Sequence, residues 1–222
     1  SLTRMLGGAF GEGLDDLILD TYLRLCFDSE DGDEIYLFGF SRGAFGARRL
    51  SGLISTVGIV SRLHTDRAFE GYQLYLTMPH DHKDDVVKKE FADACRNFRL
   101  AYGKGRRRDD GTREPLDTVP PIKYIGIFDT VAQRGVHEVI ASFTPWDDSR
   151  RFRFANYRVP DNVQHARHAC AVDENRIGFP PLLWEQLDEA NSQRSNPDAI
   201  QQRWFAGAHG DIGGGIGSKL SP

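Results

Sequence analysis

The sequence predicts an α/β fold with a mostly parallel sheet and flanking helices. Apolar runs at residues 35–38 and 122–128 have the continuous hydrophobic character of strands buried on both faces of a parallel sheet. Between them lie longer stretches with helical spacing, which is typical of parallel strands joined by helices. A chain of 222 residues is long enough to bury one large core of this kind.

Composition and charge exclude several classes of protein. Lys and Arg number 28 against 32 Asp and Glu, a net charge of −4, so no overall positive field draws the chain to nucleic acid. A basic cluster at 104–108 is followed at once by acidic residues. This cluster predicts a solvated loop, with transient contact to an anionic membrane surface as the alternative.

The cysteines and the apolar segments bear on compartment. Cys26, Cys95 and Cys170 lie far apart without a C-x-x-C pair, which indicates buried free thiols rather than a disulfide scaffold or zinc ribbon. We find neither a signal-peptide pattern at the start nor the run of about 18 apolar residues that a spanning helix needs. Synthesis in the cytoplasm is therefore expected.

The first predicted elements are a glycine-rich loop at 1–13 and a helix at about 13–27. The apolar residues of that helix recur at helical spacing: Leu14, Leu17, Ile18, Tyr22 and Leu25. Asp15 and Asp16 in its first turn complement the helix dipole. An acidic turn at 28–33 leads into the strand that begins at Ile35.

Ser41 is the centre of a Gly-Phe-Ser-Arg-Gly sequence that fits G-x-S-x-G, between that strand and a helix with apolar spacing over 44–57. In a nucleophile elbow the serine occupies a strained bend, and Gly39 and Gly43 must be small because neighbouring backbone passes close to them. The hydroxyl then lies beyond the carboxyl edge of the sheet. There the N–H of Arg42 and the start of the helix can stabilise an oxyanion.

The alternative for this stretch is a glycine-rich turn that binds phosphate or only reverses the chain. A G-x-G-x-x-G loop would need glycine at position 41, and no Gly-Lys-Ser/Thr follows as in a P-loop. The strand before and the helix after the serine are the context that a nucleophile elbow requires. The context therefore favours acyl transfer.

Residues 62–118 are predicted to form an insertion between two strands of the sheet. It contains helical stretches at about 67–75 and 84–100 and a charged loop at 103–118. Such an insertion is expected to act as a cap that gives a lipid-like or aryl substrate its apolar wall. A helical excursion that covers a sheet edge is the other reading.

Downstream strands are predicted at 122–128, about 165–172 and about 202–207. Asp129 and Asp173 follow the first two, and His209 follows the third. The remaining segments are predicted as loop at 143–146 and 150–153, and as a short helix or turn at 180–185. Polar residues after parallel strands gather at one edge of the sheet, where catalytic groups of such folds lie.

A serine nucleophile needs a base, and the base needs a carboxylate that fixes its tautomer. Ser41, Asp129 and His209 follow the order Ser, Asp or Glu, His that this architecture uses. Asp173 is the alternative acid, because it also ends a strand. Asp211 is only two residues from the histidine and is expected to cap the next turn or fix the glycine loop.

A metal site is the rival interpretation of the histidines. His165 with His168, and His209 with Asp211, carry nitrogen and oxygen ligands. Neither spacing is a recognised ligand frame, and His165 and His168 would face different sides of a strand. We therefore predict no metal and no cofactor.

Four strings occur in order along the chain: GFSRGAFGARRLSGL (39–53), IGIFDTV (125–131), ACAVDENR (169–176) followed by FPPLLWE (179–185), and WFAGAHGDIGGG (204–215). They resemble the uncharacterised α/β-hydrolase domain family that contains the bacterial type VI secretion phospholipase effectors. The resemblance implies a lipase-type hydrolase with nucleophile Ser41, base His209 and acid Asp129. By analogy it implies a phospholipid substrate, export by a machine that needs no signal peptide, and a secretion or immunity partner.

The start of the chain differs from the family pattern. Members typically open with a strand and an Asp-Gly loop, and an α/β-hydrolase takes its second oxyanion donor from a loop near an early strand. Only a helix precedes the elbow strand here, so we expect an N-terminal portion of the parent protein upstream. The hypothesis is ester hydrolysis through an acyl-enzyme, and the alternative is a non-catalytic hydrolase-like binding module.

Overall fold

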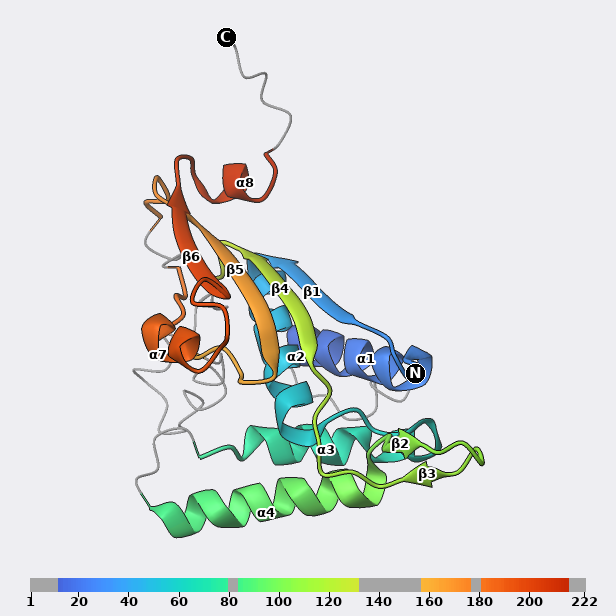
Figure 1. The fold of residues 1–222 in the computed structure, drawn as a ribbon. Helices are drawn as coiled ribbons and strands as arrows, with labels where there is room; N and C mark the ends of the chain where they lie inside the picture. Colours follow the sequence, from blue (N-terminus) through green and yellow to red (C-terminus); the bar gives the residue numbers. More distant parts are fainter. Residues whose placement is uncertain (1–11, 80–83, 132–156, 177–180, 216–222) are drawn as a thin grey trace, which may run out of the picture. The chain divides into compact units, whose positions relative to one another are not determined.

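The computed structural model describes residues 12–79, 84–131, 157–176 and 181–215 (Figure 1). The chain divides into two compact units, one of Ser1–Glu34 with Leu50–Pro121 and the other of Ile35–Arg49 with Ile122–Pro222. The loops predicted at 143–146 and 150–153, and residues 1–11 of the loop predicted at 1–13, lie outside the described residues.

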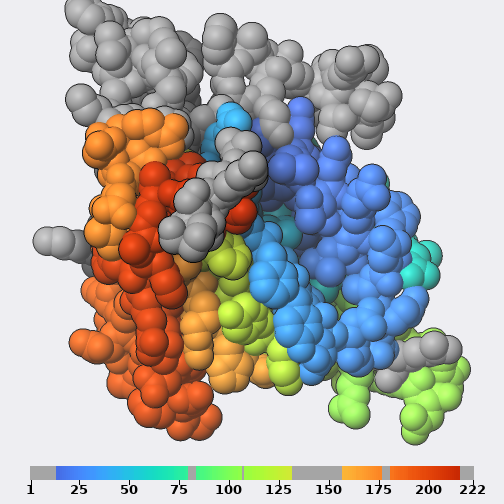
Figure 2. Space-filling model, turned by 90° about the horizontal axis from the view of Figure 1, so that it is seen from above, coloured from blue at the N-terminus to red at the C-terminus, as the bar shows by residue number. Residues whose placement is uncertain are grey.

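The second unit contains a four-stranded sheet in the order β1-β4-β5-β6. Its strands are β1 (Ile35–Phe40), β4 (Ile122–Phe128), β5 (Val163–Ala171) and β6 (Ile200–Phe205). Every neighbouring pair is parallel, and Figure 2 shows the same order from blue β1 through yellow-green β4 and orange β5 to red β6. The predicted mixed α/β class with a parallel sheet is therefore confirmed for the described residues.

Register aligns the strand ends at one edge of the sheet. Phe40 pairs with Phe128, and Phe128 pairs with Ala169 on β5. β4 has the bounds predicted from the sequence, whereas β5 and β6 each begin two residues earlier than expected. Since all strands run in the same direction, the residues that follow them meet at the carboxyl edge.

α2 (Arg42–Val57) follows β1, and its first half belongs to the same unit as the sheet. Arg48 is buried, and its guanidinium donates from Nη1 to Leu182 O at 2.5 Å and from Nη2 to Leu183 O at 3.3 Å. It also lies 5.5 Å from the centre of the Trp184 ring, within cation–π range. The helix is thereby joined to the segment that precedes α7 (Leu187–Ser192).

The prediction of a short helix or turn at 180–185 is wrong for residues 181–185, the part that the structure describes. Pro181 forms a bridge with Val131, and the N–H of Leu182 donates to Thr130 O at 2.7 Å. These backbone groups bond to the chain after β4 rather than to a helical turn, and α7 begins only at Leu187.

The first unit contains the remaining helices and a hairpin. These elements are α1 (Glu12–Asp28), η2 (Arg62–Arg67), α3 (Ala68–Leu76), α4 (Asp85–Tyr102), β2 (Arg106–Arg107) and β3 (Arg113–Glu114). α1 buries Ile18, Tyr22 and Cys26, but Leu17, expected on the core face, is 55% exposed. The charged segment predicted as loop contains the antiparallel β2–β3 pair.

Two further predictions concern this unit. Cys26 and Cys95, like Cys170 in the other unit, are buried free thiols, as expected. Residues 62–118 form part of the first unit, and their role as a cap stays a prediction.

No helix in the described part of the chain combines the length and apolar character needed to cross a bilayer.

Candidate active site

Ser41 occupies the sharp turn between β1 and α2. Its backbone φ of 58° lies in the left-handed region, which residues with a side chain rarely adopt. Such backbone strain is expected at a nucleophile elbow. The N–H of Ser41 donates to Phe128 O on β4 at 3.0 Å, and its carbonyl accepts Phe45 N–H at 3.2 Å. Two backbone hydrogen bonds therefore hold the turn from the strand side and the helix side.

The two glycines that flank the elbow have different surroundings. A Cβ placed on Gly39 would lie 2.3 Å from Gly43 O, so this position accepts only hydrogen, as predicted. A Cβ on Gly43 would meet nothing within 4 Å. The crowding expected at Gly43 is therefore wrong: its carbonyl crowds Gly39, but its own α-carbon faces open space.

Asp129 follows β4 directly and is 1% exposed. Its φ is 37°, so a second residue with a side chain adopts the left-handed region at this edge of the sheet. The N–H of Asp129 donates to Ala169 O at 2.7 Å, and its Oδ1 accepts Ala171 N–H at 2.9 Å. The backbone N–H and the Oδ1 atom of Asp129 are thus bonded to β5, and the other carboxylate oxygen, Oδ2, is left for a partner outside that strand.

His209 is the first residue of α8 (His209–Ile212) and is 7% exposed. Its Nδ1 lies 2.6 Å from Asp129 Oδ2, and its Nε2 lies 2.8 Å from Ser41 Oγ. A carboxylate can only accept, so Nδ1 carries the proton and Nε2 is left to accept from the serine hydroxyl. The structure therefore brings Ser41, Asp129 and His209 together in one chain of hydrogen bonds.

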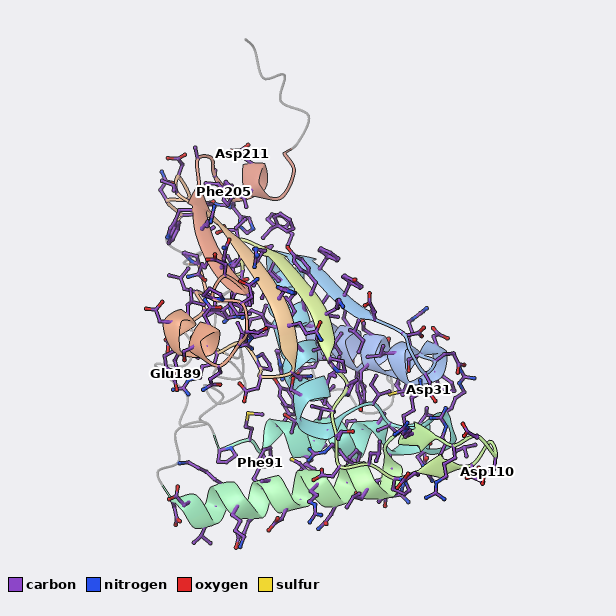
Figure 3. All side chains as sticks on the ribbon, in the orientation of Figure 1. Asp31, Phe91, Asp110, Glu189, Phe205 and Asp211 are labelled. Carbon is purple, nitrogen blue, oxygen red and sulfur yellow. The ribbon has the colours of Figure 1, made fainter. Side chains whose placement is uncertain are left out.

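Asp173, the alternative acid, does not contact the imidazole in this arrangement. Its Oδ2 accepts Gly207 N–H at 2.7 Å, and its N–H donates to Gly207 O at 3.1 Å. Asp211 accepts Ala208 N–H at 2.9 Å, which is the capping contact predicted for it. Both carboxylates stabilise the loop that presents His209 (Figure 3 labels Asp211 on α8).

Phe40 packs against the imidazole. The two ring centres are 4.6 Å apart and the rings are tilted by 34°. A Cβ on Gly213 would lie 2.4 Å from the Phe40 ring, so the glycine run after the histidine lets the chain pass over that ring. The aromatic residue beside the serine thus supports the imidazole of His209, a contact that the sequence motif alone does not reveal.

A second buried histidine, His168, contacts the residue that follows Asp129. His168 on β5 is 2% exposed, and its Nε2 accepts the N–H of Thr130 at 3.2 Å. Its Nδ1 donates to Gln202 Oε1 at 2.8 Å, and that oxygen also accepts Trp184 N–H at 2.9 Å. Burial lowers the pKa of His168 to about 4, so the imidazole is neutral at pH 7.

His168, one of the histidines considered as a metal ligand, has other partners. His168 is used in the hydrogen bonds to Thr130 and Gln202. Among the described residues there is no cluster of three or more His, Cys, Asp or Glu arranged to hold a metal ion. The described polar groups of the site are the hydrogen-bonded side chains of Ser41, His209 and Asp129.

Sequence reasoning missed Glu174, the residue after Asp173. Its Oε2 accepts the backbone N–H of His209 at 3.3 Å, and Arg176 binds the same carboxylate. The local signal was the acidic pair at a strand end. It drew attention to Asp173 because that residue comes first after the strand, although Glu174 is the one that contacts the histidine.

The chain is similar to known proteins over most of its length. Over residues 1–221 the chain matches the family described as "T6SS, Phospholipase effector Tle1-like, catalytic domain". It is also 29% identical over 186 residues to the uncharacterized protein YEL023C of Saccharomyces cerevisiae, covering 84% of this chain but only 24% of the yeast protein. The resemblance drawn from the four sequence strings is confirmed: the chain belongs to the Tle1-like family of type VI secretion phospholipase effector catalytic domains.

Proposed function

We propose that this chain is a serine esterase of the α/β-hydrolase type that cleaves carboxylic esters of lipids. Family membership indicates a lipid hydrolase. The observation that carries the finer assignment is the continuous contact from Ser41 Oγ to His209 Nε2 at 2.8 Å and from His209 Nδ1 to Asp129 Oδ2 at 2.6 Å. Three strand ends supply these groups, in the geometry that activates a serine.

In the proposed reaction His209 Nε2 takes the hydroxyl proton as Ser41 Oγ attacks the ester carbonyl. Asp129 stabilises the imidazolium that forms, and His209 then gives the proton to the leaving alcohol. Water, deprotonated by the same imidazole, then attacks the carbonyl of the acyl-enzyme. The imidazolium returns the proton to Ser41 Oγ as the carboxylic acid leaves. As the first residue of α2, Arg42 has an N–H without a carbonyl partner in its own helix, and this group is assigned to the oxyanion.

Aromatic side chains near the strand ends support a lipid as the substrate. Phe40 and Phe128 precede Ser41 and Asp129 and are 37% and 41% exposed, and Phe205 at the end of β6 is 49% exposed. Exposed large apolar groups beside a site favour an apolar ligand. Fatty acyl chains have this character, and the phospholipid preference is assigned from the family description.

The test is labelling by a fluorophosphonate probe, which reacts with an activated serine. Wild-type protein should be labelled and should release fatty acid in a screen of phospholipids and short aryl esters. Ser41→Ala should abolish labelling and lower turnover by about 10⁴-fold or more, because the nucleophile is lost. Ser192→Ala is the control, since that hydroxyl on α7 donates to Glu189 O away from the site.

Two results would contradict the proposal. Wild-type protein that is neither labelled nor active would favour the alternative of a hydrolase-like binding module. Activity that survives Ser41→Ala but is lost on chelation would indicate a metallohydrolase instead.

A further inference from the structure

The carboxylate of Glu174 connects the end of β5 with the start of α8. Its Oε2 accepts the N–H of His209 at 3.3 Å, and its side chain is only 4% exposed. The contact is made to the backbone of the histidine, not to its ring. Glu174 therefore bonds to the backbone that carries the imidazole, outside the hydrogen bonds that join Ser41, His209 and Asp129.

His209 needs such an acceptor because of its position. The first N–H groups of a helix have no carbonyl partner within the helix, and a side chain on the preceding residue accepts from the second or third helical residue, not from the first. Here the preceding residue is Ala208, whose methyl group cannot accept, and Asp211 is used for the N–H of Ala208 itself. Glu174 supplies an acceptor for the N–H of His209 from another part of the chain.

Arg176 fixes the orientation of this carboxylate. Its Nε donates to Oε1 and its Nη2 to Oε2, both at 2.8 Å, and its backbone N–H also donates to Oε1 at 2.8 Å. A two-point pair of this kind fixes the plane of the carboxylate as well as its distance. The bonds from Arg176 lower the pKa of Glu174 to about 2, so the acceptor is ionised at neutral pH.

We propose that Glu174, held by Arg176, is a positioning residue that keeps the imidazole of His209 in line between Ser41 and Asp129. The proposal rests on the function proposed above for these three residues. Because Glu174 is almost fully shielded from solvent, it does not contact substrate, and its loss should affect the reaction rather than binding.

The test compares Glu174→Ala with Glu174→Gln, whose side-chain carbonyl can still accept the N–H of His209. Because a displacement of about 1 Å can cost about 100-fold in rate, Glu174→Ala should lower kcat by about that factor with KM within about twofold of wild type. Glu174→Gln should recover most of the loss. Glu189→Ala, on α7 at the opposite end of β6 from α8, is the matched control (Figure 3) and should match wild type.

Two further measurements separate positioning from simple stabilisation. Arg176→Gln, which leaves the carboxylate but removes its two-point partner, should lower kcat by about tenfold. The proton on His209 Nδ1, hydrogen-bonded to Asp129 at 2.6 Å, should give a low-field NMR resonance that is retained in Ser41→Ala and shifted or broadened in Glu174→Ala.

The outcomes are distinct from those of the proposed function. An active wild type whose Glu174→Ala variant has normal kcat and a normal Nδ1 proton resonance, with only a lower Tm, would overturn the positioning role. If the wild type itself is inactive, the proposed function fails, and the resonance alone decides whether Glu174 orients the imidazole.

Discussion

Ser41 and Asp129 both adopt a left-handed backbone conformation, with φ of 58° and 37°. For residues that carry a side chain this costs about 1 to 3 kcal/mol each, so neighbouring contacts must maintain it. Those contacts are hydrogen bonds to adjacent strands, from Ser41 N–H to Phe128 O and from Asp129 N–H to Ala169 O. The strain is thus found at the two residues whose side chains meet His209.

A paired substitution distinguishes the two candidate acids. Asp129→Asn should lower kcat by about 10³- to 10⁴-fold, because an amide no longer stabilises the imidazolium or fixes the tautomer. Asp173→Asn should leave kcat close to wild type, since its carbonyl can still accept Gly207 N–H. Steady-state kinetics on one ester measure both. A larger loss from Asp173→Asn would reverse the assignment.

At the scale of the elements, the β1–α2 turn depends on one close approach. The α-carbon of Gly39 faces Gly43 O so closely that a Cβ would lie 2.3 Å from it. Real Cβ atoms do not come so near, and therefore any side chain at 39 must displace the start of α2 and Ser41 with it.

The two glycines of the motif should respond in opposite directions. Gly39→Ala should lower the free energy of unfolding by about 1 to 3 kcal/mol through overpacking, and should slow fluorophosphonate labelling of Ser41. Gly43→Ala, with nothing within 4 Å of its Cβ, should raise the free energy of unfolding by about 0.5 kcal/mol, because alanine favours the helix. Urea unfolding measures both, and equal losses at the two positions would contradict the turn geometry.

How far the sequence predicts these elements depends on whether the signal is local. The strand at 122–128 and the strand, turn and helix around Ser41 were predictable from neighbouring residues, because apolar runs and the glycine-flanked serine are local patterns. The choice between Asp129 and Asp173 was not, since it depends on strand order and on which neighbour each carboxylate meets. The segment at 180–185 failed for a similar reason: Leu182 bonds to Thr130, which is remote in sequence.

At the scale of the whole molecule, the site belongs to one of the two compact units, although its residues are separated by the other in sequence. Within that unit His168 joins Thr130 after β4 to Gln202 on β6. Burial keeps this imidazole neutral at pH 7, with a pKa of about 4 against an ordinary 6.5. At low pH, protonation of His168 is therefore less favourable in the folded chain than in the unfolded chain.

The fold should accordingly lose stability in acid. The unfolded chain binds a proton at His168 near pH 6.5 and the folded chain only near about 4, so stability falls as pH drops through this window, by about 3 kcal/mol in total. In His168→Asn the free energy of unfolding should depend less on pH over this range. Urea unfolding at several pH values measures it. An unchanged slope in His168→Asn would assign the acid sensitivity elsewhere.

The hydrogen bonds along the carboxyl edge have a consequence for how the chain can vary in length. Ser41 is bonded to the last residue of β4, Asp129 to β5, and Asp173 to the residue that follows the end of β6 by two positions. Because side chains alternate along a strand, inserting or deleting a single residue within β4 would turn Asp129 away from His209, and a change within β5 would move the Ala171 N–H away from the carboxylate of Asp129. Relatives that keep this arrangement of Ser41, Asp129 and His209 are therefore expected to accumulate insertions in the connections between strands, and to leave the number of residues in β4 and β5 unchanged.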